Sequence, residues 1–335
     1  MHVLVTGANG FVGAVLCRKL IERGDEVNGL VRKTSDLSSL KDVSIRQVVG
    51  SLEDPASLDE AVRSAGIVYH AAAAVSDWGT LKQFRRINVE GTRNLIEASV
   101  KAGVQRFVYV SSIAVHSFID ASDLDENAPQ LPTIFPYAQS KREAEELVMD
   151  YFRRGLIQTV IVRPGDIYGP GDRVTLLKMA PLLEKGRMGT IDGGRALGAF
   201  TYVENLADGM ILAGVKPEVA GQTYLITDGI KLTWKEYLEK LTGVLGVRRP
   251  WYSINGRLAY GIAIVLESIY RLFRIQSRPL LTRYVVNHMT GDFHFRINKA
   301  KKELGYRPRL DIDEEIRETA SWYKKVVRGE KSKGQ

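Results

Sequence analysis

Three residues in the first half of the chain have the types and spacing needed to move a proton to or from a substrate oxygen. Tyr137 and Lys141 are four residues apart, so on a helix the phenol and the ammonium group share one face. A free tyrosine has a pKa of about 10, and a nearby cation favours the phenolate, so we expect Lys141 to lower the pKa of Tyr137. Ser112 ends a predicted strand, where its hydroxyl could donate to the same oxygen. On its own, a Tyr-x-x-x-Lys pair is more often an ordinary surface pair.

A second chemical motif stands at the start of the chain. There the pattern predicts a strand over 2–6, a turn with Gly7, Gly10 and Gly13, and a helix over 14–20. In such a unit the glycines allow a tight turn and a close backbone approach to a pyrophosphate, and the helix N-terminus attracts the phosphate charges. The alternative is a purely structural turn. The predicted dinucleotide contacts in this turn are Gly7, Asn9, Gly10, Phe11 and Val12.

Two further stretches of the sequence concern the binding of the same dinucleotide. A strand is predicted over 26–31, and Arg32 and Lys33 follow it. An acid at this position usually accepts a hydrogen bond from a ribose 2′-hydroxyl, whereas arginine accommodates a 2′-phosphate, so NADP(H) is favoured over NAD(H). Alternatively, both cations are solvated loop charges. A buried strand over 67–70 runs into Ala71, Ala72 and Ala73, whose small side chains would let the cofactor lie against backbone.

These motifs need a scaffold, and the alternation of strands and helices predicts a doubly wound parallel α/β sheet. Residues 1–164 would form mainly the dinucleotide-binding domain, and residues 165–328 mainly a smaller substrate-binding lobe. Segments at about 200–228 would return to the main body, and 329–335 would be a disordered tail. Other strands are expected over 43–49, 106–110 and 160–162, and helices over 55–65, 84–102 and 312–327.

Composition narrows the class of protein. The 335 residues are 44% hydrophobic and 26% charged, which is ordinary for a globular chain, and the net charge is +8. No Lys/Arg block alternates with aromatic residues, which argues against a nucleic-acid partner. Cys17 is the only cysteine, no signal peptide precedes the first strand, and no apolar run approaches the roughly 18 residues of a membrane span. We expect a cytoplasmic protein without a metal site.

The motifs resemble the extended short-chain dehydrogenase/reductase family, over nearly the whole chain. The resemblance implies a Rossmann fold, a Ser112–Tyr137–Lys141 catalytic set, and a hydrogen bond from Lys141 to the nicotinamide ribose. It also implies cofactor contacts by Leu52, Pro164 and Ile167. One departure is Ser51, where the family commonly has an aspartate that contacts adenine. The matching stretches are 6–13, 70–73, 88–92, 110–112, 137–141 and 163–170.

Two positions separate branches of that family. Sugar-nucleotide epimerases and dehydratases usually have an asparagine and a diphosphate-binding arginine where this chain has Asp166 and Gly198. The stretches 165–173, 200–205, 279–283 and 299–306 instead resemble the 3β-hydroxysteroid dehydrogenase branch, which includes reductases of long-chain 2-alkyl-3-keto acids. The resemblance implies interconversion of a 3-hydroxyl and a 3-ketone on a bulky lipid-like molecule.

Residues 256–275 carry an apolar helical stripe with arginines toward its end, which predicts either a pocket wall, a peripheral membrane contact, or an ordinary packed helix. The resemblance to the family also implies a homodimer, which no feature of the residues themselves indicates. Two other functions stay open: a sugar-nucleotide epimerase that retains NAD, and a non-catalytic dinucleotide sensor. The candidate substrate contacts are Trp78, His116, Asp166 and Arg173. Trp78 is alternatively a core residue, and for His116 a loop position with no ligand role is at least an equal alternative.

Overall fold

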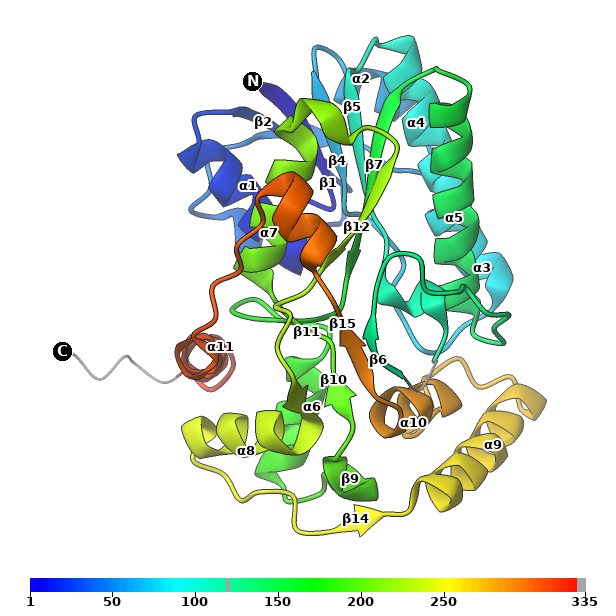
Figure 1. The fold of residues 1–335 in the computed structure, drawn as a ribbon, viewed down its shortest axis with the longest axis vertical. Helices are drawn as coiled ribbons and strands as arrows, with labels where there is room; N and C mark the ends of the chain where they lie inside the picture. The colour runs from blue at the N-terminus through cyan, green and yellow to red at the C-terminus, as the bar shows by residue number, and fades with distance from the viewer. Residues whose placement is uncertain (119–120, 330–335) are drawn as a thin grey trace, which may run out of the picture.

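The computed structural model describes residues 1–118 and 121–329, and it is built around a seven-stranded parallel sheet (Figure 1). The strand order is β12 (Gln222–Ile226), β7 (Gln158–Pro164), β5 (Arg106–Val110), β4 (Ile67–His70), β1 (His2–Thr6), β2 (Glu26–Val31) and β3 (Arg46–Val49). Strands β2 and β4 pair with opposite edges of β1, so the order of the strands reverses at β1. The doubly wound Rossmann-type prediction is confirmed. Apart from Gly329, the tail predicted over 329–335 lies outside the described residues.

Helices cover both faces of the sheet because side chains of a strand alternate between its faces. Val3 and Val5 of β1 join one core cluster with α1 (Phe11–Glu22) and α7 (Val203–Val215). Leu4, between them, joins the cluster on the other face. The helices on that face are α2 (Pro55–Ala61), α4 (Gly91–Lys101) and α5 (Pro136–Arg153), and α4 and α5 lie to the right of the sheet in Figure 1.

The segment predicted as one helix over 84–102 is more complex. Helix α3 (Leu81–Arg85) begins earlier, because Thr80 and Gln83 form a capping box at its start. A π-helical turn, Arg86–Glu90, then joins α3 to α4. Such turns inside helices are frequent at functional sites, and this one carries Asn88. Other boundaries also differ from the prediction: β3 begins at Arg46 and α2 ends at Ala61, whereas α1 and β7 are both longer than expected.

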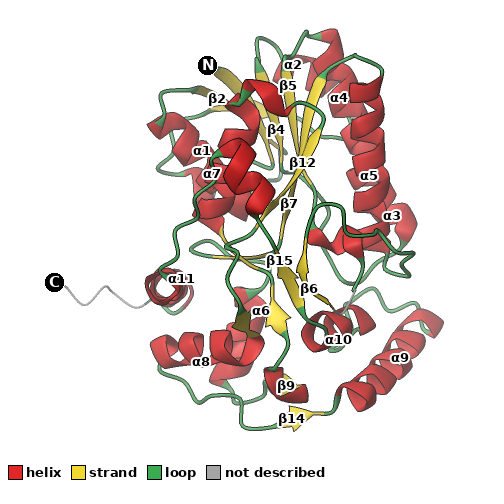
Figure 2. Cartoon of the chain, viewed as in Figure 1, coloured by secondary structure: helices red, strands yellow, loops and turns green. Residues whose placement is uncertain are grey.

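The lobe contains helices and short strand pairs below the sheet (Figure 2). Its helices are α6 (Leu176–Glu184), α8 (Trp234–Leu245), α9 (Gly256–Leu272), α10 (Arg283–Thr290) and α11 (Ile312–Val327). Its strand pairs are β8 (Asp166–Tyr168) with β11 (Phe200–Tyr202), β10 (Leu197–Gly198) with β13 (Leu232–Thr233), β14 (Ser253–Ile254) with β9 (Thr190–Ile191), and β15 (Phe293–Phe295) with β6 (Ala121–Leu124).

The chain enters the lobe after β7 and then returns to the sheet. Helix α7 packs against α1, and β12 pairs in parallel with β7 along the edge of the sheet. Residues 203–226 are therefore part of the main body although lobe segments flank them. Within the described ranges, none of the helices has the length and apolarity required to traverse a bilayer.

Candidate active site

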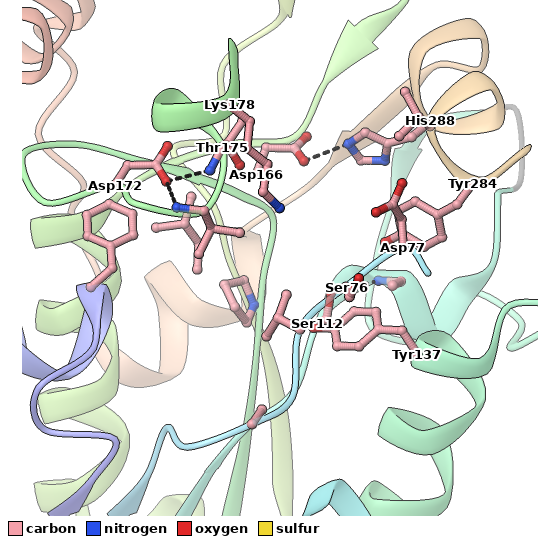
Figure 3. Close-up of a pocket in the computed structure, with 18 of the residues that line it drawn as sticks. Ser76, Asp77, Ser112, Tyr137, Asp166, Asp172, Thr175, Lys178, Tyr284 and His288 are labelled. Atoms are coloured by element: carbon pink, nitrogen blue, oxygen red, sulfur yellow. Dashed lines mark hydrogen bonds and ion pairs between the residues drawn. The ribbon is translucent and has the colours of Figure 1, made fainter. Parts of the chain in front are cut away.

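A cleft of about 1220 Å³ lies where the carboxyl ends of the sheet strands face the lobe (Figure 3). Open α/β sheets bind their ligands at this edge, next to the point where the strand order reverses. Lys33, Trp78, His116 and Arg173 do not line it. The predicted residues that do line it are Gly7, Asn9, Gly10, Phe11, Val12, Arg32, Leu52, Ala71, Ala72, Ala73, Ser112, Tyr137, Lys141, Pro164, Asp166 and Ile167.

The glycine turn fits the phosphates of a dinucleotide. Gly7 has a φ of +69°, which favours glycine, and a Cβ on Gly13 would lie 2.1 Å from the Gly7 carbonyl oxygen. Only glycine therefore lets α1 begin so close to β1. Gly10 caps α1 without a side chain, so the first amides of the helix stay available to an anion.

The alanine segment after β4 is held by buried polar side chains. His70 is hydrogen-bonded to Thr6 Oγ1 at 2.7 Å and to Thr92 Oγ1 at 2.9 Å, and Thr6 Oγ1 accepts from the Ala72 amide. Asn88 accepts from the Ala74 amide at 2.7 Å and donates to the Ala74 carbonyl at 3.0 Å. These contacts fix the backbone that would lie against a cofactor. The stretch 88–92 resembles the family pattern, but nothing in the sequence indicates this role of Asn88.

Ser112, Tyr137 and Lys141 form what we call the floor of the cleft. Ser112 follows β5, and Tyr137 lies in the first turn of α5, after Pro136. Burial raises the pKa of Tyr137 to about 12, and a hydrogen bond with Ser112 opposes that shift. The phenol is therefore protonated near neutral pH and ready to donate a proton.

Lys141 does not have the expected effect on the tyrosine. Burial lowers the pKa of Lys141 to about 7, so the ammonium group is only partly charged near neutrality. Its Nζ donates to the Val110 carbonyl at 2.7 Å and to the Tyr109 hydroxyl at 3.3 Å. The prediction that Lys141 lowers the pKa of Tyr137 is wrong for this geometry, because both groups are buried and the lysine is directed to β5.

His116 lies beneath the floor, fully buried, and not in the cleft. Its Nδ1 donates to the Ala128 carbonyl at 3.0 Å, and its Nε2 accepts from Arg163 Nη1 at 3.1 Å. Burial and the Arg163 charge lower the pKa of His116 to about 4, so it is neutral. Arg163 also makes a bidentate pair with Glu145 of α5, at 2.8 and 2.6 Å. His116 is therefore a positioning residue that helps fix α5, and its candidacy as a substrate contact is corrected.

Across the cleft, three side chains form what we call the lobe wall: Asp166, Tyr284 and His288. His288 Nε2 is 2.6 Å from Asp166 Oδ1, and the ring stacks on Tyr284 (Figure 3). Burial would lower the pKa of His288, but the Asp166 carboxylate outweighs this and raises it. The wall therefore exposes two groups to the cleft: His288, which is protonated more readily than an ordinary histidine, and the phenol of Tyr284.

Asp77 connects this wall to the main body. It accepts from Arg278 Nε at 2.6 Å and from the Thr282 hydroxyl at 2.7 Å, immediately before α10. Sequence reasoning missed Asp77, Arg278, Tyr284 and His288. No motif marks them, because their partners lie far away along the chain.

The other misplaced candidates have structural roles. Trp78 lies edge-on to Tyr270 and within 5.6 Å of the Arg271 guanidinium, so it contacts the end of α9. Arg173 pairs with Asp36 at 2.6 Å and donates to Ser38 at 2.9 Å, linking the lobe to the loop after β2. Neither side chain lines the cleft, so the structure gives no support to either one as a substrate contact. Lys33 is exposed beside Arg32, which lines the cleft.

Known proteins resemble this chain over nearly its whole length. Residues 3–227 match the family described as "NAD dependent epimerase/dehydratase family". A 2-alkyl-3-oxoalkanoate reductase of Stenotrophomonas maltophilia is 32% identical, with 95% of this chain and 98% of the relative covered. A 3-beta-hydroxysteroid dehydrogenase of Mycolicibacterium neoaurum is 31% identical, with 96% of this chain and 91% of the relative covered. The structure of a dTDP-glucose 4,6-dehydratase from Streptomyces venezuelae with NAD bound is similar at a TM-score of 0.79, with 26% identity over 98% of both chains.

Proposed function

The chain belongs to the NAD dependent epimerase/dehydratase family and is an oxidoreductase of alcohol and carbonyl groups, and we propose that it is a ketoreductase specific for bulky, lipid-like 3-ketones. The proposal includes a preference for NADP(H) over NAD(H). The observation that carries it is the placement of the Tyr137 phenol beside the Ser112 hydroxyl on the floor of a wide cleft. A phenol placed there can give its proton to a substrate oxygen, which is what reduction of a ketone requires.

The three floor residues have different roles in the reduction of the ketone. Bound NADPH supplies the hydride. Ser112 and Tyr137 both donate hydrogen bonds to the ketone oxygen, and Tyr137 transfers its proton as that oxygen gains charge. The hydrogen bond from Lys141 Nζ to the Val110 carbonyl holds the lysine in place. From there its ammonium group would bind the nicotinamide ribose of the cofactor. In the reverse direction Tyr137 takes the proton back from the alcohol.

The far side of the cleft supports a large apolar substrate. Two curated relatives are named for a 3-oxoalkanoate and for a 3-beta-hydroxysteroid, and both names put the reacting oxygen at carbon 3 of an apolar molecule. The hydrocarbon part of such a molecule would find apolar and aromatic surface beyond the floor. The residues that provide it are Met179, Leu182, Phe200, Trp234, Tyr237 and Met289.

A nucleotide sugar fits this cleft less well. Position 198, where the related sugar-nucleotide enzymes carry an arginine, is glycine, and even a Cβ there would lie 2.5 Å from the Phe200 ring. A buried diphosphate would therefore lack that cation, and leaving its charge unpaired would be costly.

The test is to mix the purified protein with NADPH or NADH and follow the loss of reduced-nicotinamide absorbance. The substrates are a long-chain 2-alkyl-3-keto acid, a 3-keto steroid and a UDP-sugar. Oxidation of NADPH with either lipid-like ketone supports the proposal. Inactivity with both ketones, together with isomerisation of the UDP-sugar, would replace it with the epimerase function.

Cofactor choice needs a variant of its own. Arg32 lines the cleft after β2, so Arg32→Ala should raise the KM for NADPH by about tenfold and leave the KM for NADH nearly unchanged. Lys33→Ala, at an exposed position outside the cleft, is the matched control. If Arg32→Ala changes neither value, the preference for NADP(H) is wrong while the ketoreductase proposal stands.

A further inference from the structure

We propose that α9 is a docking surface for an anionic lipid bilayer. The helix packs on the lobe through small residues, Ala259 and Ala263, and through the buried Glu267. Its large apolar side chains point the other way, and they are between 39% and 77% exposed. They recur at three- and four-residue intervals, which places them on one face of the helix. They are Leu258, Ile262, Val265, Ile269, Leu272 and Phe273.

This arrangement is the reverse of an ordinary surface helix, which buries its apolar stripe. A contiguous exposed apolar face on a folded chain marks a binding surface. Helix α9 lies at the outer edge of the lobe in Figure 1, with α10 beside it. Its outward face is therefore free to meet a large flat partner.

The charges around α9 identify the partner as anionic. Residues 241–291 contain seven arginines and a single acid, Glu267. That acid is buried and pairs with Arg283 at 2.8 Å and with Arg271 at 3.6 Å. Arg257, Arg271 and Arg274 are exposed on the helix or directly after it. An apolar face flanked by arginines suits a bilayer with anionic headgroups.

The same charges argue against a second copy of the chain as the partner. Two α9 faces brought together would place arginines opposite arginines, and like charges across an interface are unfavourable. A bilayer containing acidic lipids instead supplies both the apolar interior and the negative charge.

The exposed apolar surface also continues to the mouth of the cleft. Leu280, which follows α9, is 77% exposed and lines the cleft, as do Arg278 and Leu281. A lipid-like ketone could therefore pass from the bilayer to the floor without crossing water. This part of the inference rests on the proposed function, whereas bilayer binding itself does not.

The first experiment measures co-sedimentation of the full chain with vesicles of phosphatidylcholine, with and without phosphatidylglycerol. We expect binding to the anionic vesicles that weakens as salt is added, because exposed charges are screened. Leu272→Glu combined with Phe273→Glu should lower the partition coefficient by at least about tenfold, since two apolar side chains are lost from the bilayer. Val326→Glu, at an exposed apolar position on α11, is the matched control and should bind like the unchanged chain.

Two results would overturn the inference: no binding to anionic vesicles, or equal binding by the double variant. A dimer that dissociates in the double variant, measured by sedimentation velocity without lipid, would make a second copy the occupant instead. Turnover of a water-dissolved ketone by the double variant should stay normal. Absence of all ketone reduction would defeat the proposed function and leave the vesicle result standing.

Discussion

The floor and the lobe wall face each other across one cleft but are specified in different ways. On the floor, Tyr137 and Lys141 are neighbours on α5, and Ser112 follows β5, the sheet strand that comes before that helix. On the wall, His288 meets Asp166 over 122 residues of chain, and the link from the wall to the main body joins Arg278 to Asp77 over 201. The comparison shows that local sequence places the floor residues, whereas contacts between distant segments of the chain build the lobe wall.

The largest expected effect tests whether only the floor performs chemistry. Tyr137→Phe removes the proton donor, so kcat should fall by about 10³-fold while the cofactor dissociation constant changes little. Tyr284→Phe removes the half-buried phenol of the wall and is the matched control, with kcat lowered less than about tenfold. Steady-state kinetics and cofactor titration measure both. Equal losses in the two variants would show that the wall shares the chemistry.

Ser112→Ala should have the next largest effect. It removes one hydrogen bond to the ketone oxygen but leaves the proton donor, so kcat should fall by about 10- to 100-fold with a small change in KM. The Ser112 hydroxyl also accepts from the Ala114 amide at 3.1 Å, so a thermal unfolding curve must accompany the kinetics. A rise in KM at constant kcat would mean that Ser112 only binds substrate.

The link between the two regions can be weakened at Asp77. Asp77→Asn removes a charge that pairs with Arg278 and should lower the free energy of unfolding by about 2 kcal/mol at neutral pH. Burial raises the pKa of Asp77, but Arg278 and Thr282 outweigh this and lower it below 3.8. Its contribution is therefore present above pH 3.8 and is lost as the pH falls through the lowered value.

Urea unfolding of the unchanged chain and the Asp77→Asn variant measures this difference. Asp59→Asn, which breaks an exposed pair with Lys101, is the control and should change the free energy by less than about 0.5 kcal/mol. If both variants lose equally little, the lobe is not held through Asp77.

The smallest expected effect is a pH-dependent loss of stability when the Asp166–His288 pair of the wall is broken. Because the pKa of His288 is raised, the Asp166–His288 pair stabilises the fold fully below pH 6.5, and this stabilisation is lost as the pH rises through the raised value. Asp166→Asn should therefore cost about 1 kcal/mol near pH 6 and less at higher pH. Unfolding curves across this range measure it. A constant difference would show that the histidine does not titrate with the carboxylate.

The sequence predicted the fold class and the glycine turn at its start because each depends on local patterns. The glycines at 7, 10 and 13 and the Tyr137–Lys141 spacing fix geometry within a few residues. His116 was misplaced because Ser117, with a φ of +60°, ends a short turn that directs the histidine inward, toward Arg163. His288 had no pattern at all, since its partner comes from β8.

The state of Lys141 was also beyond sequence reasoning. Spacing placed it near Tyr137, but its pKa depends on how deeply α5 packs against β5. Likewise, the stripe on α9 was visible in the sequence, whereas its outward orientation depends on which face Ala259 and Ala263 bury.

The late position of β12 in the chain has a consequence for biosynthesis. A ribosome that has made residues 1–164 has released six of the seven sheet strands, but β12, the partner of β7, comes only at 222–226. At roughly 5–20 residues per second, several seconds pass before it arrives. During that time the apolar edge of β7 can pair with the strands of other nascent chains. Slower initiation of translation, which spaces ribosomes further apart on the messenger, should therefore raise the yield of folded protein.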